Sequence, residues 1–243
     1  RPEVHNAFDD ALISSLLEEL RRLSEDSNVR VLCLTGAGAS FSAGADLNWM
    51  RRAANFSEEE NTADAHQLAA MLRTLDEFPC PTLALVNGAA FGGGIGLVAA
   101  CDIAIASTQA RFSLSEVRLG LVPATISPYV VAAIGQRAAR RFYLTGERFD
   151  ANTAHSIDLV HEVVPHDELK AAGEKMIDTL LCGAPKAQAV AKNLIKETAP
   201  ARDRDYLDAW TARLIAEIRQ TDEAAEGLAA FFDKRPAAWQ TQR

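Results

Sequence analysis

Apolar and polar residues follow two kinds of pattern along the chain, and each pattern predicts its own kind of element. Leucines recur at helical spacing over residues 7–23, which predicts an amphipathic helix. Short apolar runs with β-branched residues predict buried strands instead, because both faces of such a run are apolar. Three of these runs occur, over residues 29–35, 81–86 and 101–106. A shorter strand is expected around Phe112 and Leu114, which alternate with serines.

The rest of the pattern is mostly helical. Residues 55–64 are polar and are expected to form a mobile loop before a helix over residues 65–78. The glycine run at residues 92–94 is expected to open a helix of small residues that ends at Ala100. Strands that alternate with helices and are followed by helices alone indicate an α/β fold with a helical C-terminal part. The helices of that part are predicted over residues 167–181, 186–198 and 205–219.

Composition and charge narrow the class of protein. A chain of 243 residues, 48% of them hydrophobic, suits one compact domain or a domain with a small helical appendage. The net charge of −8 argues against a nucleic-acid partner, although a local basic patch could still hold one polyphosphate. No apolar run reaches the roughly 18 residues of a membrane span, and the first residues lack the apolar stretch of a signal peptide. We therefore expect a cytoplasmic protein without a membrane partner.

The cysteines and histidines do not suggest a metal site. The five histidines form no pair at ligand spacing on one helix. Asp102, at the start of a predicted strand, is expected to cap a helix end or to bond backbone groups rather than to take part in chemistry. The cysteines are far apart in apolar surroundings and are expected to be buried free thiols; they are Cys33, Cys80, Cys101 and Cys182.

Candidate chemistry lies at two junctions where a strand ends and a helix begins. The first junction is FSAGAD, residues 41–46, and the second is GAAFGGG, residues 88–94. At such a junction the unpaired N–H groups and the helix dipole favour negative charge. Glycine also lets a ligand come close to the backbone. Each junction alone is as typical of tight packing as of a binding loop.

Together with the later segment SLSEVRLGLVPA, the two junctions carry a specific resemblance. The chain resembles the enoyl-CoA hydratase/isomerase (crotonase) superfamily over nearly its whole length, in the motifs RPEVHNAF, FSAGADL, NGAAFGGG, ACDIAIA, FSLSEVRLGLVPA and LTGERFDANTAHSIDLVHEVV. The resemblance implies an α/β fold of the crotonase type, with a spiral of ββα turns over residues 1–185. It also implies a helical segment over residues 186–243 that joins subunits into homotrimers, commonly stacked as hexamers. Phe231 and Phe232 are expected at that subunit contact. The family's first strands precede the RPE motif, so this chain is expected to lack them.

The resemblance also assigns roles to individual residues. The N–H groups of Ala45 and Gly93 would form an oxyanion hole for the oxygen of an acyl-CoA thioester, and Glu116 would be the acid/base group. Two fixed donors aimed at that oxygen would stabilise the enolate formed by addition or proton removal. Coenzyme A enters as part of the substrate, so no separate cofactor and no metal is expected. The expected binding residues are Ala43, Asp46, Leu47, Gly92, Gly96 and Ala124.

One position departs from the family pattern. Hydratases of this family usually carry two glutamates, and this chain has Glu116 at the second position but Gly96 at the first. A single glutamate could add water if it activates the water and then returns the proton to the α-carbon. It could equally shuttle a proton in double-bond isomerisation, which needs no water. A non-catalytic relative that binds acyl-CoA or RNA is a third interpretation.

Further segments look most like bacterial methylglutaconyl-CoA hydratases of leucine and isoprenoid breakdown, namely LSEVRLGLVPATISPYVV, GIGLVAACD and EGLAAFFDKRPAAW. Gly96 is expected to leave space near the reacting carbons, which would suit a 3-branched substrate such as 3-methylglutaconyl-CoA. Arg118 is a candidate partner for a distal substrate carboxylate, with a surface or interface role as the alternative. We therefore expect an enoyl-CoA hydratase, a carbon–oxygen lyase, that acts on a 3-branched thioester.

Other nucleotide-binding and hydrolase folds fit the sequence poorly. Starting from Gly92, a GxGxxG dinucleotide motif would need glycine at Leu97, and no acidic residue ends a second strand about 20 residues later. No glycine loop is followed by the lysine and serine or threonine of a phosphate-binding loop, and no GxSxG motif occurs. Dinucleotide binding, phosphoryl transfer and α/β-hydrolase chemistry are therefore disfavoured.

Overall fold

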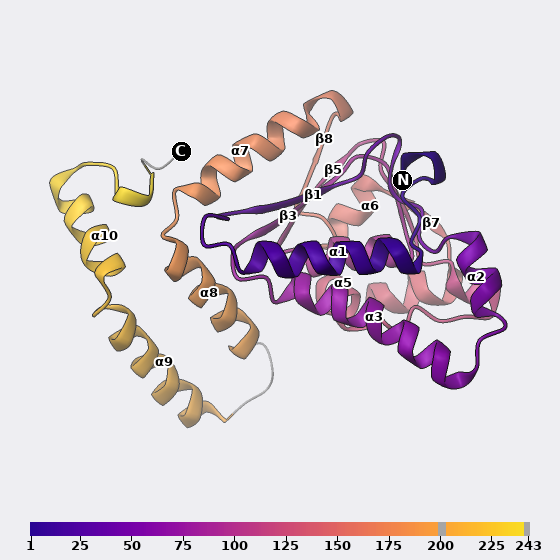
Figure 1. The fold of residues 1–243 in the computed structure, drawn as a ribbon. Helices are drawn as coiled ribbons and strands as arrows, with labels where there is room; N and C mark the ends of the chain where they lie inside the picture. Colours follow the sequence, from indigo (N-terminus) through magenta and orange to yellow (C-terminus); the bar gives the residue numbers. More distant parts are fainter. Residues whose placement is uncertain (199–202, 241–243) are drawn as a thin grey trace. The chain divides into compact units, whose positions relative to one another are not determined.

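The structure of the chain is a computed structural model that describes residues 1–198 and 203–240 (Figure 1). The chain forms two compact units, of which the first holds residues 1–78 and 82–174 and the second holds residues 79–81 and 175–243. All strands of the described chain belong to the first unit. None of the described helices is both long enough and apolar enough to cross a membrane.

Two four-stranded sheets form the first unit. The first sheet is parallel throughout and contains, in spatial order, β1 (Leu32–Thr35), β3 (Thr82–Val86), β5 (Ile103–Ser107) and β8 (Glu162–Val164). The second contains, in order, β2 (Ser40–Ser42), β4 (Ala89–Phe91), β6 (Arg111–Ser113) and β7 (Arg148–Asp150). Only β7 runs antiparallel to its neighbour; β2, β4 and β6 are parallel.

Each of the first three turns of the chain adds one strand to the first sheet and one strand to the second sheet. β1 and β2 form one turn, β3 and β4 the next, and β5 and β6 the third. Helices close the turns: α2 (Leu47–Ala53) with α3 (Glu58–Asp76), then α4 (Gly93–Ala100), then α5 (Ser127–Thr145). The predicted spiral of ββα turns is confirmed. Since β2, β4 and β6 are parallel neighbours, the segments that follow them emerge at the same edge of the second sheet.

Helix α1 (Asp10–Ser24) packs against α3 through the apolar face that the leucine spacing predicted. It begins at Asp10 rather than at residue 7 because the carboxylate of Asp9 caps it, accepting a hydrogen bond from the N–H of Leu12. The buried side chains of the two helices are Ile13, Leu17, Leu20, Met71, Leu72 and Leu75. The remaining short elements of the first unit are the 3₁₀ helices Pro2–Val4 (η1), Glu116–Leu119 (η2) and His166–Glu168 (η3), and the helix Ala151–Ser156 (α6).

The expected loop over residues 55–64 is mostly helix, so that prediction is wrong. Helix α3 begins at Glu58, and a reciprocal capping box fixes its start. The Ser57 hydroxyl accepts from the Glu60 N–H, while the Glu60 carboxylate accepts from the Ser57 N–H. The first turns of α3 are polar because they are exposed, and so they show no apolar period.

The strand predicted over residues 29–35 is present as β1, but the prediction that it is buried is wrong. β1 lies at the edge of its sheet, and its residues alternate between half-buried and exposed. Cys33 on this strand is exposed, as is Cys182, whereas Cys80 is half-buried and only Cys101 is buried. The expectation of four buried thiols therefore fails. The two central strands of this sheet, β3 and β5, are buried almost throughout, as predicted.

Asp102 has the structural role that the sequence suggested. Its carboxylate accepts hydrogen bonds from the Thr82 N–H at 2.8 Å and from the Thr82 hydroxyl at 2.9 Å. These bonds tie the start of β5 to the start of β3. Asp102 is thus committed to the sheet and not to the chemistry of the site.

The second unit is helical. α7 (Leu169–Leu181) leads into it, and α8 (Pro185–Thr198), α9 (Arg204–Ile218), α10 (Asp222–Asp233) and the 3₁₀ helix Ala238–Gln240 (η4) follow. The three predicted C-terminal helices are confirmed, with small shifts at their ends. The Glu223 carboxylate accepts from the N–H groups of Lys186 and Ala187 at 3.1 and 2.8 Å, at the start of α8 where an anion is favourable. Phe231 and Phe232 are 76% and 74% exposed on α10.

Candidate active site

The first predicted junction is held in place by the N-terminal segment of the chain. The Phe8 N–H donates to the Gly44 carbonyl and the Asp46 N–H donates to the Phe8 carbonyl, both at 2.7 Å. These two bonds form an isolated parallel bridge between Phe8 and Ala45. Because the bridge uses the N–H groups of Phe8 and Asp46, the N–H of Ala45 stays outside it. Ala45 itself is exposed.

A second set of hydrogen bonds fixes the strand that leads into this junction. The Asn6 side-chain amide donates to the carbonyls of Ala37 and Ser40 at 2.8 and 2.7 Å. The Ser42 hydroxyl donates to the Asn6 carbonyl at 2.9 Å. His5 and Asn6 adopt left-handed backbone conformations, with φ of 56° and 54°, which asparagine tolerates better than most residues. Both residues belong to the RPEVHNAF motif, but their role in this bonding was not predicted from the sequence.

Gly44 brings the first junction against the second. Its φ is +84°, and a Cβ at this position would lie 2.9 Å from the carbonyl oxygen of Phe91, the last residue of β4. Glycine is needed here both for the left-handed conformation and for the close approach. Gly44 therefore contacts the end of β4, and the Ala45 N–H belongs to the next peptide along the chain.

The second junction supplies the other N–H group. Gly93 is the first residue of α4, and Gly92, with φ of 49°, stands before it. The N–H of a first helical residue has no acceptor within its own helix. Over residues 1–198 and 203–240, neither the Gly93 N–H nor the Ala45 N–H donates to an acceptor of the chain. The structure thus leaves two backbone donors available, one after β2 and one after β4.

Glu116 lies beside the second junction. It opens η2, the segment after β6, and a Cβ at Gly92 would lie 3.0 Å from its Oε1 atom. Its other carboxyl oxygen, Oε2, is buried and has no hydrogen-bond partner in the described part of the chain. Burial raises the pKa of the Glu116 carboxyl above its ordinary value. A carboxyl with a raised pKa and an unused oxygen is suited to accept and return a proton.

Gly96 does not leave the open space that was expected of it. The residue is buried, and a Cβ there would overlap the Ile126 side chain and lie 3.5 Å from Leu72 Cδ2. Ile126 is itself only 3% exposed. An apolar side chain therefore fills the position where a second glutamate was expected, and the argument from space for a branched substrate is wrong.

The other expected binding residues differ in their exposure. Ala43 and Gly92 are half-buried, whereas Leu47 is 70% exposed and Ala124 is also exposed. Asp46 is buried and caps α2, where it accepts from the N–H groups of Asn48 and Trp49. These two N–H groups, and then the Arg1 guanidinium, hold the pKa of Asp46 below its ordinary value. The Asp46 side chain is therefore occupied in fixing the loop.

Arg118 is also committed within the chain. Its Nε and Nη2 groups both donate to the carbonyl of Thr145 at 3.2 Å. The guanidinium packs over Gly146, where an added Cβ would lie 3.0 Å from Nε. These contacts give Arg118 a structural role on η2, which was the alternative to binding a substrate carboxylate.

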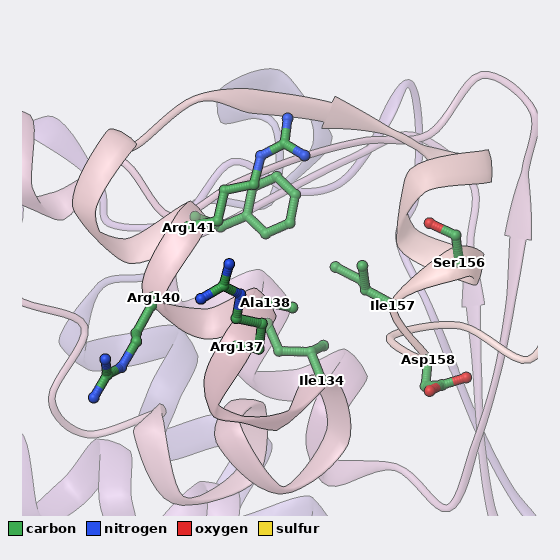
Figure 2. A pocket seen from close by; sticks show the side chains of 9 residues that line it. Ile134, Arg137, Ala138, Arg140, Arg141, Ser156, Ile157 and Asp158 are labelled. Carbon is green, nitrogen blue, oxygen red and sulfur yellow. The ribbon is translucent and has the colours of Figure 1, made fainter.

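A hollow on the surface of the first unit lies away from these residues. It is an open depression of about 610 Å³ between α5 and the end of α6. Figure 2 shows its lining, in which Arg137, Arg140 and Arg141 come from α5 and Ile157 and Asp158 follow α6. None of the predicted site residues borders it. The candidate site is therefore defined by backbone donors and by Glu116 and not by this depression.

The arrangement as a whole can polarise a carbonyl group and move a proton on a neighbouring carbon. Ala45, Gly93 and Glu116 each follow one strand of the trio β2, β4 and β6, at one edge of the second sheet. Two donors from separate loops can hold a developing oxyanion. Among the described residues, no group of three histidines, cysteines or carboxylates could hold a metal ion.

Comparison with known proteins places the chain in a family. The sequence profile "Enoyl-CoA hydratase/isomerase" matches residues 1–242. A crystal structure of an enoyl-CoA hydratase from Shewanella pealeana superposes with a TM-score of 0.95 and 47% sequence identity, covering 98% of this chain and 89% of that chain.

Curated relatives agree with this placement. An enoyl-CoA hydratase of Alternaria alternata is 36% identical over 95% of this chain and 76% of its own. The 2,3-dehydroadipyl-CoA hydratase of Escherichia coli is 31% identical over 97% of this chain and 90% of its own. With its crotonase fold and these matches along its length, the chain is an enzyme of the enoyl-CoA hydratase/isomerase family.

Proposed function

We propose that the chain adds water across the α,β double bond of an enoyl-CoA thioester. The water oxygen bonds to the β-carbon, the electrons of the double bond move onto the thioester oxygen, and Glu116 accepts a proton from the water. The N–H groups of Ala45 and Gly93 hold the resulting enolate oxygen. Protonated Glu116 then gives its proton to the α-carbon, so that the carboxylate is restored and the atoms balance.

The state of Glu116 is the observation that carries this proposal. A glutamate with a structural role would have its buried oxygens bonded to donors, yet Oε2 of Glu116 is buried without one in the described chain. The same carboxyl lies against Gly92, next to the free N–H of Gly93. Leaving a buried carboxyl oxygen and a neighbouring N–H donor without partners lowers the stability of the fold. A bound substrate could supply the missing partner to each group.

We further propose that the substrate is a 3-branched thioester with a distal carboxylate, such as 3-methylglutaconyl-CoA. The support is the resemblance of the segments around Glu116 and at the C-terminus. A second support is a relative named for a thioester with a distal carboxylate, 2,3-dehydroadipyl-CoA hydratase. The volume around Gly96 gives no support, because Ile126 fills it.

Double-bond isomerisation is the second candidate, and one observation favours it. The position of the other glutamate in the two-glutamate pattern is Gly96, and the buried apolar side chain of Ile126 fills the space beside it. Isomerisation needs only one carboxyl that removes a proton from one carbon and returns it to another. It uses the same enolate and the same two N–H groups, so the site alone supports either reaction.

We also propose that the chain acts as a homotrimer or hexamer and needs no cofactor beyond the coenzyme A of its substrate. Three large apolar side chains on α10 support an association through that helix, since Leu228, Phe231 and Phe232 are 54%, 76% and 74% exposed. Exposed apolar groups of this size, gathered on one helix, are typical of a protein–protein contact.

Incubation with three thioesters tests the proposed function. Crotonyl-CoA and 3-methylglutaconyl-CoA report water addition, and a 3-enoyl-CoA reports isomerisation, each followed by its own product. We expect hydration of both 2-enoyl substrates, faster with the branched one. Turnover of the 3-enoyl substrate alone would replace hydration by isomerisation, and binding of all three without turnover would leave a non-catalytic acyl-CoA-binding protein.

A further inference from the structure

A pair of hydroxyl groups on α5 has no part in the reaction described so far. The Ser127 hydroxyl donates to the carbonyl of Pro123 at 2.6 Å, and the Tyr143 hydroxyl lies 3.2 Å from Ser127 Oγ. A serine has one proton to donate, and a carbonyl can only accept. The Ser127 proton is therefore taken by Pro123, and Tyr143 must donate its own proton to Ser127. The Tyr143 oxygen is left as a hydrogen-bond acceptor.

Three hydrogen bonds hold the end of α5 beside the segment of Glu116. Two of them run from the Arg118 guanidinium to the Thr145 carbonyl, and the third runs from the Ser113 hydroxyl to the Gly146 carbonyl at 3.3 Å. Tyr143 is half-buried and lies two residues before Thr145. Burial raises the pKa of its phenol, and the nearby charge of Glu116 raises the pKa further. Tyr143 thus stays neutral and lies within the electrostatic reach of the carboxylate.

Two hydrogen-bond acceptors consequently lie on segments that are bonded to each other. One is the Tyr143 oxygen, and the other is Oε2 of Glu116, which is buried and unpartnered in the described chain. No direct bond between two acceptors is possible, whereas a water molecule has two hydrogens and can bridge them. Such a water would keep its oxygen lone pairs free for attack on a carbon.

We infer that the Ser127–Tyr143 pair holds the reacting water, which donates one hydrogen to Tyr143 and the other to Glu116. This inference rests on the proposed hydration. Only the proton bound to Glu116 leaves the water, and the other stays on the new hydroxyl group of the product. Tyr143 gains and loses no proton, and Ser127 is a positioning residue that orients it. The pair performs the water-holding task of a second glutamate, for which Ile126 leaves no room.

Tyr143→Phe tests the inference by separating water addition from proton transfer. Losing this hydrogen bond should slow hydration of crotonyl-CoA about 10-fold or more. Exchange of the α-hydrogens of butyryl-CoA with solvent deuterium needs Glu116 and the two N–H groups but no added water. That exchange should stay near the wild-type rate, and so should the affinity for butyryl-CoA. Ser127→Ala should show the same pattern with a smaller loss, and the double variant should be no slower than Tyr143→Phe.

Tyr129→Phe serves as the matched control, since it removes a phenol hydroxyl from another half-buried tyrosine of α5. It should hydrate crotonyl-CoA as the wild type does. Wild-type hydration by Tyr143→Phe would overturn the water-holding role while the proposed function stands. Equal losses of hydration and of deuterium exchange would also overturn it, by showing a structural role. Failure of the wild type itself to hydrate the thioester would refute the proposed function together with this inference.

Discussion

The two halves of the site are built in opposite ways. The oxyanion loop, residues 40–46, is held by hydrogen bonds to Phe8 and Asn6 and by the cap of Asp46, and these bonds leave the Ala45 N–H without an acceptor in the described chain. The glutamate segment, residues 113–118, holds a buried carboxyl whose Oε2 has no partner in the described chain. The difference teaches that a group that stabilises charge is fixed beforehand, whereas a group that moves protons must be left unsatisfied.

The largest loss of activity is expected from a substitution in the oxyanion loop, at Gly44. Gly44→Ala would strain a backbone with φ of +84° and press a methyl group onto the Phe91 carbonyl, 2.9 Å away. Displacing the Ala45 N–H should lower kcat by about 10²- to 10³-fold, as for other lost oxyanion donors. Steady-state hydration of crotonyl-CoA measures this.

Gly135→Ala is the control for strain alone. Gly135 has a similar φ of +69° but nothing within 4 Å of an added Cβ. It should lose some stability and keep its activity. Equal activity losses in both glycine variants would contradict the role given to the oxyanion loop.

A smaller effect is expected where Ile126 meets Gly96. Gly96→Ala should destabilise the protein by about 1–3 kcal/mol through overpacking. In an Ile126→Ala background the same change should cost much less, because the methyl group then enters a vacated space. The coupling in this double-mutant cycle, expected at about 0.5–3 kcal/mol, is measured by urea unfolding. Additive free energies would show that Ile126 does not occupy the place of the missing glutamate.

Removing the N-cap of α2 should lower the stability less than overpacking at Gly96 does, but it should still lower the activity. Asp46→Ala removes the acceptor for the N–H groups of Asn48 and Trp49, at a typical cost of about 1 kcal/mol. Since α2 starts right after Ala45, kcat should fall as well. Asp9→Ala removes a comparable cap from α1, and it should lower the unfolding free energy by a similar amount and leave kcat closer to wild type. A larger kcat loss in Asp9→Ala would refute this reasoning.

The smallest expected effect is the change in stability with pH that Glu116 causes. The pKa of Glu116 is raised by burial in the folded state, so the folded chain holds that proton more tightly than the unfolded chain. This contribution to stability is present below the ordinary carboxyl pKa and is lost as the pH rises through the raised pKa. Glu116→Gln should therefore unfold at a higher temperature than wild type at neutral pH, and the difference should shrink in acid.

Glu147→Gln should behave in the opposite way. The pKa of Glu147 is lowered, chiefly by its hydrogen bond from Arg141. Its contribution to stability is present above the ordinary carboxyl pKa and is lost as the pH falls through the lowered value. The variant should therefore be slightly less stable at neutral pH. Thermal unfolding of the two variants at neutral and acid pH shows whether the signs differ, and the same sign in both would count against an unsatisfied Glu116.

The sequence predicted some elements of this molecule and missed others. The helices α1, α7, α8 and α9 and the central strands β3 and β5 were predicted from their apolar patterns, whereas the helices α5 and α10 were not. The three-residue strands β2, β4 and β7 were not predicted either, since three residues cannot show a period. The start of α3 was missed although Ser57 and Glu60 form a capping-box signal.

In the site, the motifs indicated which backbone groups and which glutamate matter, and they could not indicate what surrounds them. The filling of Gly96 by Ile126 depends on packing between α4 and α5, residues far apart in sequence. The polarity of the Ser127–Tyr143 pair depends in the same way on where the Pro123 carbonyl lies. Such contacts are set by tertiary structure and leave no local pattern.

The central claim is that Glu116 moves the protons while the backbone donors of the other half hold the thioester. Glu116→Gln keeps the shape of the side chain and removes its basicity, so it tests the claim most directly. Hydration of crotonyl-CoA should fall by at least about 100-fold, the low end for a lost acid/base group, while the Kd for butyryl-CoA stays near that of the wild type. Near-normal hydration by Glu116→Gln would contradict the account.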